Sequence, residues 1–262
     1  MKLNFSNSFF HYPLGHGSGN AGTLLEIAVF NIQSAFVACA SGADRIELCE
    51  NPADGGTTPS YGALKTAKAK ISVPVFPIIR PRGGDFLYSD DEYYAMQKDI
   101  ELCRQLQFEG IVIGLLNIDG SIDTNRTSRL VDLAYPMEVT FHRAFDRAKD
   151  PFQSLEKIVH CGCQRILTSG QVPNAFDGKE LIKELIQQAD GRIIIMPGSG
   201  VRSDNIKELA EYTGATELHS SARKSVTSEM KFVNQAMHET LQNISVDADE
   251  VKKMRLELGK QV

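Results

Sequence analysis

The chain has 262 residues, with 28 Lys and Arg, 33 Asp and Glu and a net charge of −5. With 42% hydrophobic and 23% charged residues, it has the composition of an ordinary soluble globular protein, which excludes disordered, collagen-like and disulfide-scaffold proteins. No apolar run approaches the roughly 20 residues that cross a bilayer, so an integral membrane protein is excluded. Because there is no block of Lys and Arg, we expect no nucleic-acid partner, although a small anion remains a candidate ligand.

The N-terminus and the cysteines bear on domain organisation and location. Polar residues between Asn4 and Ser8 interrupt the apolar core that a signal peptide needs. We therefore expect residues 1–23 to form a disordered N-terminal extension and residues 24–262 to form one domain. The five cysteines are an odd number and lie in predicted helices and strands, which indicates free thiols in a reducing cytoplasm.

From Leu24 onward, β-branched or aliphatic runs alternate with amphipathic stretches, which is typical of βα units around a parallel sheet. The predicted strands are Leu24–Phe30, Arg45–Glu50, Val73–Arg80, Ile111–Leu116, Met137–Arg143, Arg165–Ser169, Ile193–Pro197 and Thr216–Ser220. The predicted helices are Ile32–Ala40, Gly62–Lys70, Asp90–Leu106, Asp123–Ala134, Pro151–His160, Gly178–Ala189, Ser203–Tyr212 and Asp247–Leu258.

This alternation predicts an α/β fold, a (β/α)8 TIM-type barrel with eight parallel strands, which typically takes about 250 residues. A doubly wound open sheet is the alternative. Against it, the first strand-to-helix turn, Val29 to Ile32, has no Gly-rich dinucleotide fingerprint.

The loops that follow strands are the expected place of the functional site. Connections from helix to strand are short and contain Gly, whereas several connections from strand to helix are longer and polar. The long connections are Asn51–Tyr61, Pro81–Ser89, Asn117–Ile122, Gly170–Asp177 and Gly198–Arg202. In a barrel these loops gather at the carboxyl ends of the strands, where such folds build their sites.

Several predicted strands carry polar residues at positions whose side chains alternate toward the barrel interior. They are Glu26, Glu47, Cys49, Arg80, His142 with its neighbour Arg143, Glu217 and His219. Isolated buried charges are costly, so these groups either pair with one another as a polar plug or serve a ligand, and their clustering favours a ligand site. For an enzyme, the candidate acids and bases are Glu47, His142, Glu217 and His219, with Arg80 as the anion clamp.

The seventh and eighth units add a candidate anion site. Gly198-Ser199-Gly200 ends a predicted strand, and Ser220-Ser221 follows the next one. Backbone N–H groups at such turns bind phosphate in many barrels, although a tight turn that requires Gly for steric reasons explains the first motif equally well. The predicted ligand-binding set is Glu26, Arg80, Arg143, Ser169, Gly198, Ser199, Gly200, Ser220 and Ser221.

Two pairs of cysteines have positions that suit a soft metal such as Cu(I). Cys161 and Cys163 lie between a helix and a strand, on the face opposite the expected site, so we favour two ordinary buried thiols there. Cys49 ends the second strand near the expected site. Cys39 lies on the preceding helix and approaches Cys49 only if the helix packs that face toward the barrel.

A series of motifs is similar to those of a known family. They are Glu47-Leu48-Cys49-Glu50 with the segment 54–60 (DGGTTPS), the segment 79–86 (IRPRGGDF), the segment 140–146 (TFHRAFD), the segment 167–170 (LTSG) and the segment 196–200 (MPGSG). In this order they resemble the copper homeostasis protein CutC family, from about Leu24 to the C-terminus. The resemblance implies a cytoplasmic TIM-type barrel linked to copper tolerance, with Cys39 and Cys49 corresponding to cysteines proposed to bind copper.

Two functions are therefore open. One is copper binding or homeostasis, with a copper ion as ligand; the other is an enzyme that acts on a small anionic or phosphorylated molecule at the carboxyl ends of the strands. Because closed symmetric assemblies are the commonest oligomers of soluble proteins, we also expect a homo-oligomer.

Overall fold

The structure is a computed structural model, and it describes residues 22–239 and 241–260. The predicted disordered extension, residues 1–23, therefore lies almost entirely outside the described residues. Within these residues, eight parallel strands and eight α-helices alternate, which confirms the predicted βα pattern.

The strands are short and their bounds follow the predicted runs. They are β1 (Leu24–Val29), β2 (Arg45–Leu48), β3 (Val75–Pro77), β4 (Gly110–Ile113), β5 (Glu138–Phe141), β6 (Arg165–Thr168), β7 (Ile194–Pro197) and β8 (Glu217–Ser220). The helices are α1 (Ile32–Ala40), α2 (Tyr61–Lys70), α3 (Asp90–Gln105), α4 (Thr124–Ala134), α5 (Pro151–His160), α6 (Lys179–Ala189), α7 (Ile206–Thr213) and α8 (Ala248–Glu257). Short 3-10 turns cover Pro52–Asp54, Arg143–Arg147 and Gln235–Met237.

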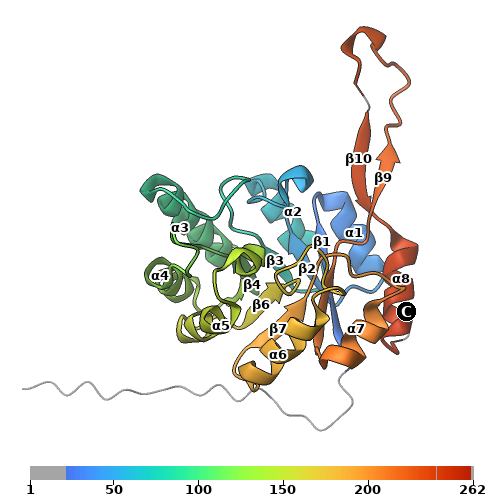
Figure 1. Ribbon diagram of the computed structural model, residues 1–262. Coiled ribbons are helices and arrows are strands. Elements are labelled where there is room, and N and C mark those ends of the chain that lie inside the picture. The colour runs from blue at the N-terminus through green and yellow to red at the C-terminus, as the bar shows by residue number, and fades with distance from the viewer. Residues whose placement is uncertain (1–21, 240, 261–262) are drawn as a thin grey trace, which may run out of the picture.

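The strands form two parallel four-stranded sheets, in the orders β3-β2-β1-β8 and β4-β5-β6-β7. Single parallel bridges connect the edges of the two sheets, Ile78 with Val112 on one side and Gly198 with His219 on the other. The helices lie around the outside of the strands (Figure 1). Strand β3 is shorter than the predicted Val73–Arg80, because its ladder to β2 covers only residues 75–77 and the chain then turns toward β4 through the bridge at Ile78.

Local sequence explains where several helices begin and end. The Ser89 side chain and Glu92 form a capping box at the start of α3, which satisfies two backbone N–H groups that have no partner within the helix. Pro151 opens α5, where its missing N–H costs nothing. The predicted start of α7 at Ser203 is wrong, because Asn205 precedes the first helical residue, Ile206.

An antiparallel hairpin was not predicted. Strands β9 (Arg223–Thr227) and β10 (Gln242–Val246) pair with each other and project away from the two sheets (Figure 1). Residues of β9 are exposed, so this strand lacks the apolar alternation by which a half-buried strand is recognised. A hydrogen bond of 2.8 Å from Asn31 Nδ2 to the carbonyl of Ile244 on β10 connects the hairpin to the body of the molecule.

Candidate functional site

A cavity of about 680 Å³ lies at the carboxyl ends of the strands. Its walls come from both sheets and from the loops that follow the strands, as sequence reasoning expects for a parallel α/β fold. The predicted site residues that line it are Glu47, Arg80, His142, Arg143, Ser199, Gly200, His219, Ser220 and Ser221. Glu26, Ser169, Gly198, Glu217, Cys39 and Cys49 are not among its lining residues.

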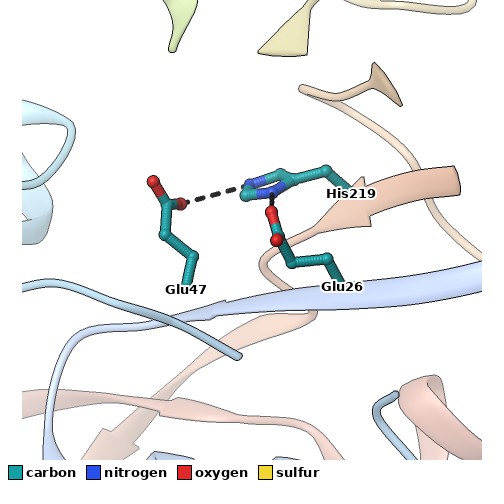
Figure 2. Close-up of side chains that lie close together, drawn as sticks. All are labelled: Glu26, Glu47 and His219. Carbon is teal, nitrogen blue, oxygen red and sulfur yellow. Dashed lines mark hydrogen bonds and ion pairs between the residues drawn. The ribbon is translucent and has the colours of Figure 1, made fainter. Parts of the chain in front are cut away.

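Three buried side chains from neighbouring strands meet at the floor of this cavity and directly behind it. Glu26 on β1, Glu47 on β2 and His219 on β8 are 1%, 5% and 8% exposed. The register places Glu26 beside His219, because β1 pairs directly with β8. The ring of His219 lies between the two carboxylates (Figure 2): its Nδ1 is 2.7 Å from Glu26 Oε1 and its Nε2 is 3.7 Å from Glu47 Oε2.

The two carboxylates have opposite electrostatic environments. Burial disfavours ionisation of Glu26, but the charge of Arg45 and the bond to His219 outweigh it and lower the pKa of Glu26 to about 2. Burial, reinforced by the charge of Glu26, raises the pKa of Glu47 to about 7 although His219 opposes the shift. For His219, burial is outweighed by the bond to Glu26 and by the two carboxylates, so its pKa is raised. Of these two carboxylates, Glu47 is thus the one without a cationic partner in hydrogen-bond contact among the described residues.

These three side chains have the donor atoms of a metal site. One oxygen of each carboxylate and one nitrogen of His219 lie within 4.8 Å of one another. Both oxygens of Glu26 are already bonded, one to His219 Nδ1 and the other to Arg45 Nε. Glu26 therefore orients the imidazole, and His219 Nε2 and Glu47 are the donors open toward the cavity, which is the carboxylate–histidine arrangement common around bound metals.

The cysteines named by the sequence do not come together. Cys49 is buried among Phe76, Ile78 and Val112 near the carboxyl end of β2. Burial raises the pKa of its thiol well above the ordinary value, and the neighbouring Glu47 carboxylate raises it further. Cys39 lies on α1, and its Sγ is 3.4 Å from Ser72 Oγ in the segment that precedes β3, at the opposite end of the strands. The geometry gives no support to one ion shared by Cys39 and Cys49.

Glu217 belongs to a different layer. The register pairs it with Leu24, one inward position below Glu26 and His219. Its Oε2 accepts hydrogen bonds from Arg45 Nη2 at 2.6 Å and Arg165 Nε at 2.7 Å. The structure thus places this candidate acid in an internal ion-pair network below the cavity.

In the predicted anion loops, two serine hydroxyls are bonded to backbone carbonyls of the protein. Ser199 Oγ donates to the Pro173 carbonyl at 2.7 Å, and Ser220 Oγ donates to the Val201 carbonyl at 2.6 Å. Because α7 begins only at Ile206, the Gly198-Ser199-Gly200 turn does not sit at a helix N-terminus. A Cβ at Gly198 would clash with Leu167, which is the steric reason for this glycine.

Arg143 and Ser169 belong to one polar network beside the cavity. Arg143 donates to Asp146 Oδ2 at 2.7 Å and to Ser169 Oγ at 2.8 Å. Sequence reasoning missed other lining residues with charge, namely Asp54, Asp146, Arg147, Arg202 and Arg223. Their position just after predicted strands was the available signal, since Asp146 and Arg147 directly extend the His142-Arg143 motif.

Comparisons with known proteins show the family of this chain. The model of the CutC family matches residues 23–224. The chain belongs to the CutC family. A CutC family protein of Chromobacterium violaceum is 50% identical over 80% of this chain and 85% of its own length. The human copper homeostasis protein cutC homolog is 47% identical over 86% of this chain and 82% of its own length.

Solved structures show the same fold. The CutC protein from Streptococcus agalactiae, described as a putative copper homeostasis protein, has a TM-score of 0.73 and 33% identity and covers 76% of this chain and 98% of its own. Phosphoribosyl anthranilate isomerase from Thermotoga maritima, at a TM-score of 0.57 and 12% identity over 90% of this chain and 98% of its own, shares the fold alone. The CutC match ends at residue 224, before most of the β9–β10 hairpin. Among the described helices, none has the length and apolarity to span a membrane.

Proposed function

We propose that this chain is a copper homeostasis protein that binds a copper ion at His219 and Glu47, with Glu26 as the residue that orients His219. The observation that carries the proposal is the buried convergence of Glu26, Glu47 and His219 at the cavity floor. The curated relatives named for copper homeostasis support copper as the ion.

The donor chemistry is compatible with this ion. Imidazole nitrogen and carboxylate oxygen suit Cu(II) and other borderline divalent ions, whereas Cu(I) prefers thiolates. Cys49, two residues after Glu47, is the thiol nearest this donor set in the sequence, and its high pKa means that a metal must displace its proton.

The test is competition with a copper chelator, in the Cu(II) and the Cu(I) state, on purified protein. We expect Glu47→Gln, which keeps the shape but removes the charge, to weaken Cu(II) affinity about tenfold or more. Glu138→Gln, a carboxylate outside the cavity, is the matched control and should bind as the native chain does.

Cysteine variants separate the two proposed donor sets. Joint replacement of Cys39 and Cys49 by Ser should abolish Cu(I) binding if the thiols hold the ion, while replacement of Cys161 and Cys163 should not. Copper affinity that is unchanged in Glu47→Gln and lost in the Cys39/Cys49 variant would show that the carboxylate–imidazole site is wrong.

A second candidate function is that of an enzyme acting on a small anionic or phosphorylated molecule. It is favoured by the arginines that line the cavity, Arg80, Arg143, Arg147, Arg202 and Arg223. Glu47 and His219, an acid and a base 3.7 Å apart at the cavity floor, are then its candidate acid–base pair. Mass spectrometry of ligands retained by the purified protein is the direct test: recovery of small anionic compounds would support it.

We further propose that the two sheets close into one eight-stranded barrel domain, since single bridges join both pairs of sheet edges. A cytoplasmic location is supported by five free cysteines within the described residues. A homo-oligomer is supported by the exposed apolar side chains of the hairpin tip, Met230 and Phe232. Sedimentation analysis tests the last point.

A further inference from the structure

Arg80 is a buried cation whose charge is offset by no carboxylate of the described residues. The residue is 4% exposed, and its guanidinium donates to the carbonyls of Asp54, Gly56 and Gly84. Within residues 22–239 and 241–260, no carboxylate lies within ion-pair distance of it, and its Nε has no hydrogen-bond partner. Carbonyl dipoles satisfy the N–H groups only in part, so the site carries an uncompensated positive charge in a poorly solvated place.

His142 is a second buried donor without an acceptor. Its Nδ1 accepts a hydrogen bond of 3.1 Å from the Ala144 backbone N–H, so in the neutral ring the proton resides on Nε2. The residue is 4% exposed, and Nε2 has no partner in the described part of the chain. Burial and the charge of Arg80 lower the pKa of His142 to about 3, which keeps the ring neutral.

The fold is shaped around this imidazole. Gly114 on the strand side leaves the room that the ring occupies, because a Cβ at that position would clash with His142. Phe86 also contacts the imidazole, with its ring centroid 4.8 Å from that of His142. The Arg80 guanidinium carbon lies 5.0 Å from the same Phe86 centroid, so the two orphaned donors share one neighbour.

Arg80 and His142 both line the cavity, as do Arg143 and Arg147. A buried N–H left without an acceptor costs about 1–3 kcal/mol, and native proteins rarely retain one without a use. An anionic oxygen satisfies both requirements at once, since it accepts the His142 Nε2–H bond and offsets the charge of Arg80.

We propose that Arg80 and His142 form an oxyanion subsite that holds the carboxylate or phosphate group of a small organic ligand in the cavity. The proposal rests on the small-anion function given above as the second candidate, and it does not involve the copper donors. It moves the expected anion site away from the Gly198-Ser199-Gly200 turn, where the Ser199 hydroxyl and the Gly200 carbonyl are already bonded within the protein.

The experiment uses a pair of substitutions at His142, because Arg80 anchors two loops and its loss endangers folding. In His142→Asn the amide oxygen reaches about as far as Nδ1 and keeps the bond from Ala144, but nothing occupies the place of Nε2. In His142→Gln the amide nitrogen reaches about as far as Nε2 and restores a donor. Lys183→Ala removes a positive charge from α6, where Lys183 packs over Tyr212, and serves as the control.

The probes are inorganic phosphate and malonate, with binding measured by calorimetry on the full chain and folding checked by thermal denaturation. We expect saturable binding of at least one probe, weakened about tenfold or more in His142→Asn and within about threefold of the native value in His142→Gln and Lys183→Ala. A preference for phosphate or for malonate identifies the ligand group as phosphate or carboxylate.

Two results would overturn the proposal, and they differ in what else they overturn. Native-like anion affinity in a folded His142→Asn variant rejects this subsite but leaves the small-anion function standing. If the native chain binds neither probe at tens of millimolar while it still binds copper, both the subsite and the small-anion function fail and copper binding is unaffected.

Discussion

Two adjacent layers inside the strands contain the same kinds of buried polar and charged side chain. In the lower layer the charges are paired with one another, whereas in the upper layer their pairing is incomplete. In the lower layer, Arg45 and Arg165 are 3% and 6% exposed, and both bond to Glu217. In the upper layer, Glu47, Arg80 and His142 are equally buried, but none has a complete set of partners of suitable charge.

The lower layer is a continuous network. Arg165 also pairs with Glu138 at 2.6 Å, and Arg45 also pairs with Glu26, which in turn holds His219. Both guanidinium groups lie over the ring of Phe76, at 4.9 and 5.3 Å from its centroid. The network fixes Glu26 and hence His219 from below, so the paired layer positions the unpaired one. Buried charge therefore indicates a ligand only where its partners are missing.

The largest effect is expected when the lower layer is broken. Glu217→Gln leaves the guanidinium groups of Arg45 and Arg165 buried without their shared carboxylate, and we expect a loss of about 3–5 kcal/mol in the free energy of unfolding. Urea denaturation measures it. The control is Glu208→Gln, which removes an exposed pair with Lys179 and should change stability by less than about 1 kcal/mol. A loss for Glu217→Gln as small as that of the control would show that the network is not structural.

Sequence reasoning reached the parallel strands and the helices of this fold and the charged residues of the upper layer, but of the lower layer it singled out only Glu217. The apolar alternation sufficed for the strands, since it depends on local sequence alone. It could not assign Glu217 and His219 to separate layers, because that requires the register of β8 against β1, which joins residues almost 200 positions apart. For the same reason it grouped Glu217 with the candidate acids.

Two other features were beyond the sequence for different reasons. The hairpin has an exposed β9 strand, so no hydrophobic pattern marks it. Arg80 Nε and His142 Nε2 stand out because no acceptor lies near them in the described residues, and a missing acceptor cannot be read from a sequence. That Arg80 ends on three backbone carbonyls, and that Ala144 fixes the tautomer of His142, follow only from the three-dimensional course of the loops.

The second-largest expected effect is a pH dependence of stability that arises from Glu47 in the upper layer. The pKa of Glu47 is raised from 4.5 to about 7 in the folded protein, so the folded state retains a proton that the unfolded chain releases. Its contribution to stability is present below about pH 4.5 and is lost as the pH rises through 7. The raised pKa of His219 has the same sign.

We therefore expect the metal-free protein to lose on the order of 2–3 kcal/mol between pH 5 and 8 through Glu47. Glu47→Gln does not titrate, so its stability should vary less over this range and exceed that of the native chain near pH 8. Denaturation at a series of pH values, with a chelator present, checks this. A pH profile that is unchanged by the substitution would mean that Glu47 is solvated or already paired, which removes the contrast between the layers.

The smallest effect is expected where the lower network reaches solvent. The Glu138 side chain is 48% exposed, whereas Arg165, its partner, is buried and keeps its bond to Glu217. Glu138→Gln removes an interaction that water can replace, so we expect a loss of less than about 1 kcal/mol that shrinks further in high salt. Urea denaturation at low and high ionic strength measures both. A loss of stability for Glu138→Gln as large as that for Glu217→Gln would show that both carboxylates are needed to offset the buried charge of Arg165. A small, salt-sensitive loss instead places the essential pairing at Glu217, directly beneath the residues that orient His219.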